Sequence, residues 1–205
     1  MKEIKKANLY KRGLSLEYFT VGYNIFEGFI SIGAGIIAGS IALVGFGLDS
    51  FIETLSGVVL IWRLRGHSED DEKERAMEQK AMRFVAYTFF ILAIYVLYEA
   101  SKKLYFREIP EGSLVGIIIA LLSIIIMPIL ASQKRIIGEK INSGALIADS
   151  KETVFCAYLS VTLLLGLLLN YFFGWWWADP AASLVIVGFL IKEGLECLEG
   201  DEDHP

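Results

Sequence analysis

The sequence has little cysteine, little histidine and no excess of positive charge. Its two cysteines, Cys156 and Cys197, both fall inside long apolar segments. A disulfide would require two helices to meet at these positions, and we expect none. The formal net charge of −5 gives no support to nucleic-acid binding. The two histidines, His67 and His204, lie in charged segments, where a solvated run of charge is the ordinary interpretation.

A cleavable signal peptide is also lacking. The chain begins with a charged stretch, residues 1–6, and its first apolar segment has the full length of a membrane-spanning helix. No Ala-x-Ala cleavage site follows that segment, so we expect it to remain in the mature protein.

Long apolar segments are what the sequence has in abundance, since 55% of its residues are hydrophobic. A transmembrane helix needs about 20 mostly apolar residues. Six segments meet this requirement, and the connections between them are too short for a soluble domain. The sequence therefore predicts an all-α integral membrane protein with a single transmembrane transport domain over residues 1–205. The six predicted transmembrane helices cover residues 16–37, 41–62, 84–104, 114–132, 145–172 and 180–197.

Lysine and arginine are unevenly distributed between the two ends of these predicted helices. Fourteen of them lie at the N-terminus or in the segments after the second and fourth helices, and three lie in the loops on the other side. Lys134 is counted here with the segment after the fourth helix. Because cytoplasmic loops carry the excess of Lys and Arg, both termini are expected in the cytoplasm.

Acidic side chains interrupt two of the apolar segments at helical spacing. In the second helix Asp49 and Glu53 lie four residues apart, so both occupy one face. In the fifth helix Glu152 and Cys156 repeat this spacing, and Asp149 precedes Glu152 by three residues. A charged group at the middle of a transmembrane helix costs at least about 2.5 kcal/mol, so it marks a function or a pairing. Two such pairs on facing helices can supply four ligands to one ion, the number that zinc prefers.

Other interpretations exist for each of these residues. Acidic residues near helix ends often face water or pair with Lys or Arg, and a lone cysteine such as Cys156 is usually a small buried apolar residue. No basic residue lies at matching depth in the first, second or fifth helix, which favours metal or proton binding by Asp49, Glu53 and Glu152. For Asp149 the sequence leaves the ion pathway and a structural role equally open.

The first predicted helix carries a polar stripe inside its apolar segment. Thr20, Asn24, Glu27 and Ser31 are spaced so that all four share one face. Asn24 and Glu27 are therefore candidates for the ion pathway or for the support of its ligands.

The sixth predicted helix has acidic residues at both ends. Asp179 followed by Pro180 is typical of a helix N-cap and the first helical residue. At the other end, Glu193, Glu196 and Glu199 are expected to approach cytoplasmic water.

Three stretches of the chain carry a resemblance to a known family. They are residues 38–53, residues 145–152 and residues 177–182. In this order they resemble helix 2, the start of helix 5 and the entry into helix 6 of the cation diffusion facilitator (cation efflux) family. The resemblance covers nearly the whole chain. It implies six helices with both ends in the cytoplasm and a divalent metal held between helices 2 and 5 and exchanged for protons.

On this resemblance, Asp49 and Glu53 take the two ligand positions of helix 2, and Glu152 and Cys156 take those of helix 5. The chain also departs from the family pattern. Glu53 stands where Asp is usual, Cys156 replaces another Asp, and no histidine occupies any of these four positions, which leaves the metal preference open. The family's usual C-terminal cytoplasmic domain is not found after the sixth helix, so we expect a short, membrane-only branch. A homodimer of such a protein would have to form through its membrane helices.

The sequence thus predicts a transporter and not an enzyme. The favoured activity is Zn²⁺/H⁺ antiport out of the cytoplasm by alternating access, in the cytoplasmic (inner) membrane of a prokaryote. The expected partners are the divalent ion, protons and the lipid bilayer, with no resident cofactor. Oxygen ligands would also suit Mn²⁺ or Fe²⁺, and a thiolate would suit Cd²⁺. The rivals are an Fe²⁺ or Mn²⁺ exporter with the same site, an exporter of organic cations, and a membrane metal sensor that binds the ion without moving it.

Overall fold

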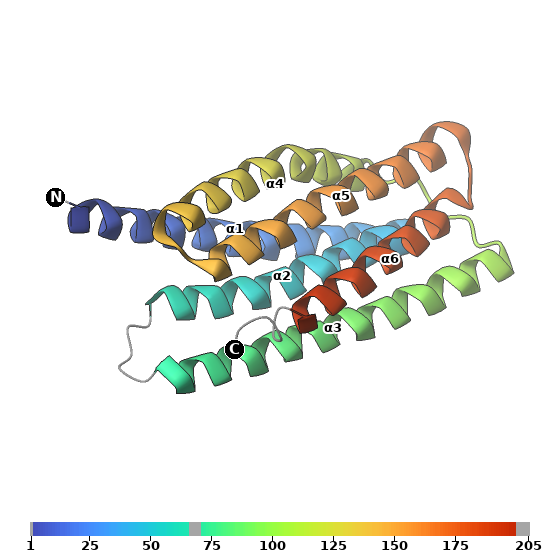
Figure 1. The fold of residues 1–205 in the computed structure, drawn as a ribbon. Helices are drawn as coiled ribbons and strands as arrows, with labels where there is room; N and C mark the ends of the chain where they lie inside the picture. The colour runs from blue at the N-terminus through green and yellow to red at the C-terminus, as the bar shows by residue number, and fades with distance from the viewer. Residues whose placement is uncertain (1, 66–70, 200–205) are drawn as a thin grey trace.

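The computed structural model describes residues 2–65 and 71–199. Within these ranges the chain forms a bundle of long α-helices and no strand, which confirms the predicted all-α membrane class (Figure 1). By length and hydropathy, α1 to α5 each contain a stretch able to cross a membrane, and α6 lies in the same bundle against α3 and α5. The helices are α1 (Lys2–Ala38), α2 (Ile41–Arg65), α3 (Asp71–Phe106), α4 (Leu114–Ile141), α5 (Gly144–Phe173) and α6 (Ala178–Glu199).

Several helices extend well beyond the apolar segments that predicted them. The first begins at Lys2 and not at residue 16, the third begins at Asp71 and not at residue 84, and α4 continues to Ile141. The added residues are rich in Lys, Glu and Arg, which are good helix formers although they are not apolar. Hydropathy marked the apolar part of each helix and not the point at which the helix ends. His67 and His204 lie outside the described residues.

A tight turn joins α4 to α5. Asn142 takes the left-handed conformation with φ 56° and ends α4, while the Ser143 hydroxyl accepts a hydrogen bond from the Leu146 amide at 3.3 Å and begins α5. Asn tolerates the left-handed region and Ser is a favoured N-cap, so the local sequence determines this reversal.

The turn between α1 and α2 depends on glycine. Gly39 has φ +61°, a left-handed backbone conformation that is strained for residues with a side chain and free of strain for glycine. One turn earlier, a Cβ on Gly35 would stand 2.7 Å from the Val44 side chain, so only glycine lets the two helices approach this closely. Helices α1 and α2 therefore pack closely against each other next to the turn that joins them.

The expectation that Asp179 caps α6 is wrong. The helix already begins at Ala178, and the Asp179 carboxylate accepts hydrogen bonds from the Ser40 hydroxyl and from the Ile41 amide, the latter at 2.9 Å. These groups belong to the start of α2, where the first amides have no partner within their own helix. Asp179 therefore caps α2 from a neighbouring helix, a contact that local sequence cannot reveal.

The helices associate as three pairs. The most extensive packing joins α1 to α2, α4 to α5 and α3 to α6. One helix of each pair, α2, α5 and α6, also contacts the other two at the centre of the bundle. Because six helices alternate in direction, α1 begins and α6 ends at the same end of the bundle (Figure 1).

Candidate metal-binding site

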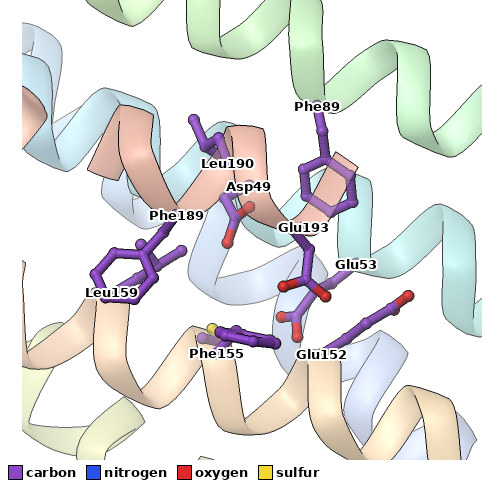
Figure 2. A pocket seen from close by; sticks show the side chains of 10 residues that line it. Asp49, Glu53, Phe89, Glu152, Phe155, Leu159, Phe189, Leu190 and Glu193 are labelled. Atoms are coloured by element: carbon purple, nitrogen blue, oxygen red, sulfur yellow. The ribbon is translucent and has the colours of Figure 1, made fainter. Parts of the chain in front are cut away.

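A pocket lies where α2, α5 and α6 meet (Figure 2). Four of its lining residues are carboxylic acids and one is a thiol. Among the described residues, none that lines the pocket is basic. The remaining walls are aromatic or aliphatic. The lining consists of Asp49, Glu53, Phe89, Glu152, Phe155, Cys156, Leu159, Phe189, Leu190 and Glu193.

Helix α2 contributes two of the predicted residues to this wall. Asp49 and Glu53 are 3% and 7% exposed, and their spacing of four places them on the face that meets α5 and α6. The Asn24 amide of α1 donates a hydrogen bond to Glu53 Oε2 at 3.1 Å. Asn24 therefore contacts one of the candidate ligands, and its role as a supporting residue stays a prediction.

Helix α5 contributes the second predicted pair. Glu152 accepts a hydrogen bond from the Ser56 hydroxyl at 2.8 Å, and the Cys197 thiol of α6 lies 3.7 Å from its other oxygen. Cys156, one turn further along α5, is a buried free thiol. Cys197 is also free, which confirms that the two cysteines form no disulfide.

The fourth carboxylate is Glu193 of α6, which sequence reasoning had assigned to cytoplasmic water. It is only 7% exposed, and Figure 2 shows its carboxylate directed towards the same part of the pocket as that of Glu53. A sequence signal existed for this placement. Ile186, Leu190, Glu193 and Cys197 follow one another at intervals of four, three and four, which places them on one buried face.

These donors line one pocket without being gathered around a point. Among the residues that the structure describes, no three His, Cys, Asp or Glu side chains are grouped closely enough to hold a metal ion as they stand. The four predicted ligands, Asp49, Glu53, Glu152 and Cys156, therefore share a cavity, and binding an ion would require them to converge.

Asp149 takes part in a different arrangement, a buried ion-pair network between α1, α4 and α5. The ammonium group of Lys134 contacts Asp149 Oδ2, lies 3.2 Å from Glu17 Oε1 and donates to the Thr153 hydroxyl at 3.3 Å. The side chains of Lys134 and Glu17 are fully buried. Asp149 therefore pairs with a lysine and does not line the pocket.

Sequence reasoning missed Lys134, which pairs with Asp149, and Glu17, which pairs with the same lysine. It placed Lys134 in a loop, because the apolar segment ended at Ser132, whereas α4 continues through this position to Ile141. The signal that could have found Lys134 is its spacing from Met127 and Ala131, at intervals of four and three on the buried face of α4.

Glu27 lies beside the pocket and not in its wall. It is 1% exposed and its Oε2 accepts a hydrogen bond from the Ser50 hydroxyl at 3.0 Å, next in sequence to Asp49. Together with Asn24 it shows that the polar stripe of α1 faces α2. Within the described residues, Glu27 Oε1 has no hydrogen-bond partner.

The bundle and its pocket define a class of protein: an all-helical integral membrane protein with carboxylates and a thiol buried between its helices. A family comparison gives this class a name. The chain belongs to the cation efflux family, because the model of its cation efflux transmembrane domain matches residues 19–199. The resemblance read from three stretches of the sequence is thereby confirmed.

Curated relatives are similar over most of the chain. An uncharacterized transporter of Methanocaldococcus jannaschii is 28% identical over 85% of the chain, and the cation-efflux pump FieF of Shewanella oneidensis is 23% identical over 82%. A cadmium, cobalt and zinc/H(+)-K(+) antiporter of Bacillus velezensis is 24% identical over 90%. The chain spans 64%, 58% and 59% of the lengths of these three proteins.

Proposed function

We propose that the protein carries a divalent metal cation across the membrane, with Zn²⁺ as the preferred ion and protons moving in exchange. The observation that carries the proposal is the buried pocket lined by Asp49, Glu53, Glu152 and Cys156, with no basic residue among the described lining. Carboxylate and thiolate are ligands that zinc accepts. Membership of the cation efflux family supports the same activity.

The charge of the pocket explains why an ion or protons must occupy it. With Glu193 included, four ionised carboxylates would place four negative charges in a space shielded from water. Buried charges of one sign are unfavourable unless they are neutralised by a cation or by protonation. One divalent ion neutralises two of the four, so metal loading and proton release are coupled by the composition of the site.

The distribution of Lys and Arg favours an orientation with both termini in the cytoplasm, and we propose that the protein lies in the inner membrane of a prokaryote and exports the ion. The ion would enter the pocket from the cytoplasm and exchange its water for the side chains. The helix pairs would then rearrange and open the pocket outward, where protons would displace the ion. This is alternating access, with no covalent chemistry, and a homodimer would form through the helices.

The donor set also bears on the metal. Cys156 is the one soft donor among harder oxygens, and thiolate favours Zn²⁺ and Cd²⁺ while carboxylate suits Mn²⁺ and Fe²⁺. The Bacillus velezensis relative is named for cadmium, cobalt and zinc, which is in line with a site of this mixed character. An Fe²⁺ or Mn²⁺ exporter that uses the same side chains is the second candidate, because oxygen donors outnumber sulfur.

The experiment is metal uptake into sealed proteoliposomes that contain a zinc-sensitive dye. Flux through the unaltered protein should increase when the trans side is made acidic, because protons there compete for the same side chains. Asp49→Asn should abolish the flux without loss of helical content. The matched control is Glu139→Gln, since Glu139 is an exposed acid paired with Arg135 on the surface of α4.

Four outcomes would contradict the proposal. Normal flux in Asp49→Asn would remove the pocket from the pathway. Flux that does not respond to pH would exclude proton exchange. Metal binding without any flux would identify a membrane metal sensor, and flux of an organic cation in place of a metal would identify another class of exporter.

A further inference from the structure

Helix α6 brings one carboxylate into the wall of a pocket that the sequence had assigned to α2 and α5 alone, and it places a thiol beside one of the pocket's acids. Glu193 forms part of the wall, and the Cys197 thiol lies 3.7 Å from Glu152 Oε1. Both side chains are 7% exposed. Figure 2 shows the Glu193 carboxylate pointing inward, between α2 and α5.

The carboxylate of Glu193 lacks the hydrogen bond that two of its neighbours in the pocket have. Glu53 is held by the Asn24 amide and Glu152 by the Ser56 hydroxyl. Glu193 Oε2 is buried and, within the described residues, has no hydrogen-bond partner. A buried carboxylate oxygen without a partner costs free energy, and folded proteins rarely keep one unless something binds there.

The next acid on α6 shows how an ordinary surface carboxylate behaves on this helix. Glu196 is 40% exposed and forms an ion pair with Lys192 at 3.4 Å. The two glutamates lie three residues apart, yet Glu196 is paired at the surface, whereas Glu193 Oε2 is buried in the pocket without a partner among the described residues. Their contrast indicates that burial of Glu193 is specific to its position and is not a general property of this end of α6.

The position of α6 in the bundle gives this carboxylate a particular importance. Helices α2, α5 and α6 each belong to a different one of the three closely packed pairs. An ion held by α2 and α5 alone would contact two pairs. An ion that also binds Glu193 would contact all three, so that occupancy of the pocket could bias the positions of every pair relative to the others.

We propose that Glu193 is a direct ligand of the bound divalent cation, so that the site draws its donors from α2, α5 and α6. The inference rests on the proposed function, because it assigns a further ligand to the same pocket. With Glu193 the pocket offers five donor side chains, one more than tetrahedral zinc uses. For Zn²⁺ the Glu193 carboxylate replaces one of the others in part of the transport cycle, and for ions that accept more ligands it adds to them.

The test measures binding of Co²⁺ to the full-length protein in detergent, because the absorption spectrum of Co²⁺ reports its coordination geometry. Glu193→Gln removes the charge while keeping the side-chain shape, and Glu193→Asp keeps a carboxylate but shortens it by one methylene. The matched control is Glu196→Gln, the same substitution one turn away on the same helix. Asp49→Asn reports separately whether Co²⁺ occupies the pocket.

We expect Glu193→Gln to weaken Co²⁺ binding about tenfold or more and to change the visible spectrum. Glu193→Asp should have an intermediate effect on affinity, and Glu196→Gln should leave both affinity and spectrum unchanged. If the Gln variant does not fold, the Asp variant carries the test, because a shorter ligand must still alter the spectrum.

Two results would overturn the inference alone. If Glu193→Gln keeps the affinity and the spectrum while Asp49→Asn loses Co²⁺, the pocket binds metal without α6. If affinity falls but the spectrum stays the same, Glu193 acts through its charge at a distance and is not a ligand. Two other results would refute the proposed metal site and this inference together. One is that Co²⁺ fails to bind the parent protein at all. The other is that Co²⁺ binds Asp49→Asn with the same affinity as the parent.

Discussion

Removing the charge of Lys134 should destabilise the bundle more than any surface substitution. Lys134→Met keeps the length of the side chain and deletes its ammonium group. The lysine side chain is completely buried, as is that of Glu17, and Asp149 is 10% exposed. The substitution would therefore leave two carboxylates inside the bundle without a cation, together with a Thr153 hydroxyl that has lost its donor.

The magnitude follows from the burial of the network. Breaking a buried ion pair by removing one partner costs about 3–5 kcal/mol, because the remaining charge is uncompensated. For a chain of this size 1 kcal/mol corresponds to roughly 2–4 °C in melting temperature. The Lys134→Met protein should therefore melt about 6–20 °C below the parent. The measurement is thermal unfolding in detergent, followed by circular dichroism.

Two further variants test the reasoning. Neutralising the whole network in Lys134→Met with Glu17→Gln and Asp149→Asn should recover most of the loss, because no uncompensated charge remains. Arg135→Met is the matched control, since this neighbouring residue forms an exposed pair with Glu139, and such pairs contribute about 1 kcal/mol or less. A single Lys134→Met variant as stable as Arg135→Met would refute the argument, as would a triple variant less stable than the single one.

Substitutions at two other positions, Cys156 and Asp179, are predicted to separate ion binding from helix capping. Cys156→Asp makes the pocket all-oxygen and should shift metal preference from Zn²⁺ and Cd²⁺ towards Mn²⁺ or Fe²⁺ in competition binding, while Cys156→Ala should weaken all of them; an unchanged preference in both would leave Cys156 as a packing residue. Asp179→Ala removes both hydrogen bonds to the start of α2 and should lower stability by about 1–3 kcal/mol in thermal unfolding, whereas Asp179→Asn, which keeps one acceptor, should lose less; equal stability of the two variants would contradict the capping role.

The pocket could be predicted in part because polar residues inside apolar segments stand out. Asp49, Glu53 and Glu152 interrupt long hydrophobic segments at helical spacing, and α2 and α5 do bring them to one cavity. Glu193 and Lys134 were missed for one physical reason. Both lie where the apolar segment gives way to charged residues. Hydropathy places the membrane–water boundary there, so it predicts that such side chains are exposed to water.

Contacts between distant helices were beyond sequence reasoning. The preference of Asp for helix N-caps is a local rule, and it predicted that Asp179 caps α6. In the tertiary structure its carboxylate instead accepts a hydrogen bond from the Ile41 amide, the first of α2. The role of Asp149 stayed open for the same reason, because the lysine that pairs with it comes from α4 and the second acid of the network comes from α1. Whether the donors converge on one point is also set by packing, and no spacing along a helix encodes it.

The pairing of the helices has a consequence for how the chain assembles. Two of the pairs, α1 with α2 and α4 with α5, join helices adjacent in sequence, so each can form as a hairpin soon after its second helix is made. The third pair joins α3 to α6, which are separated by two whole helices. Contacts between segments distant in sequence form late, because the intervening chain must first be ordered. We therefore expect α3 to be inserted well before its partner, and the acidic pocket to be enclosed only when α6, the sixth of these helices, packs against α3 and α5.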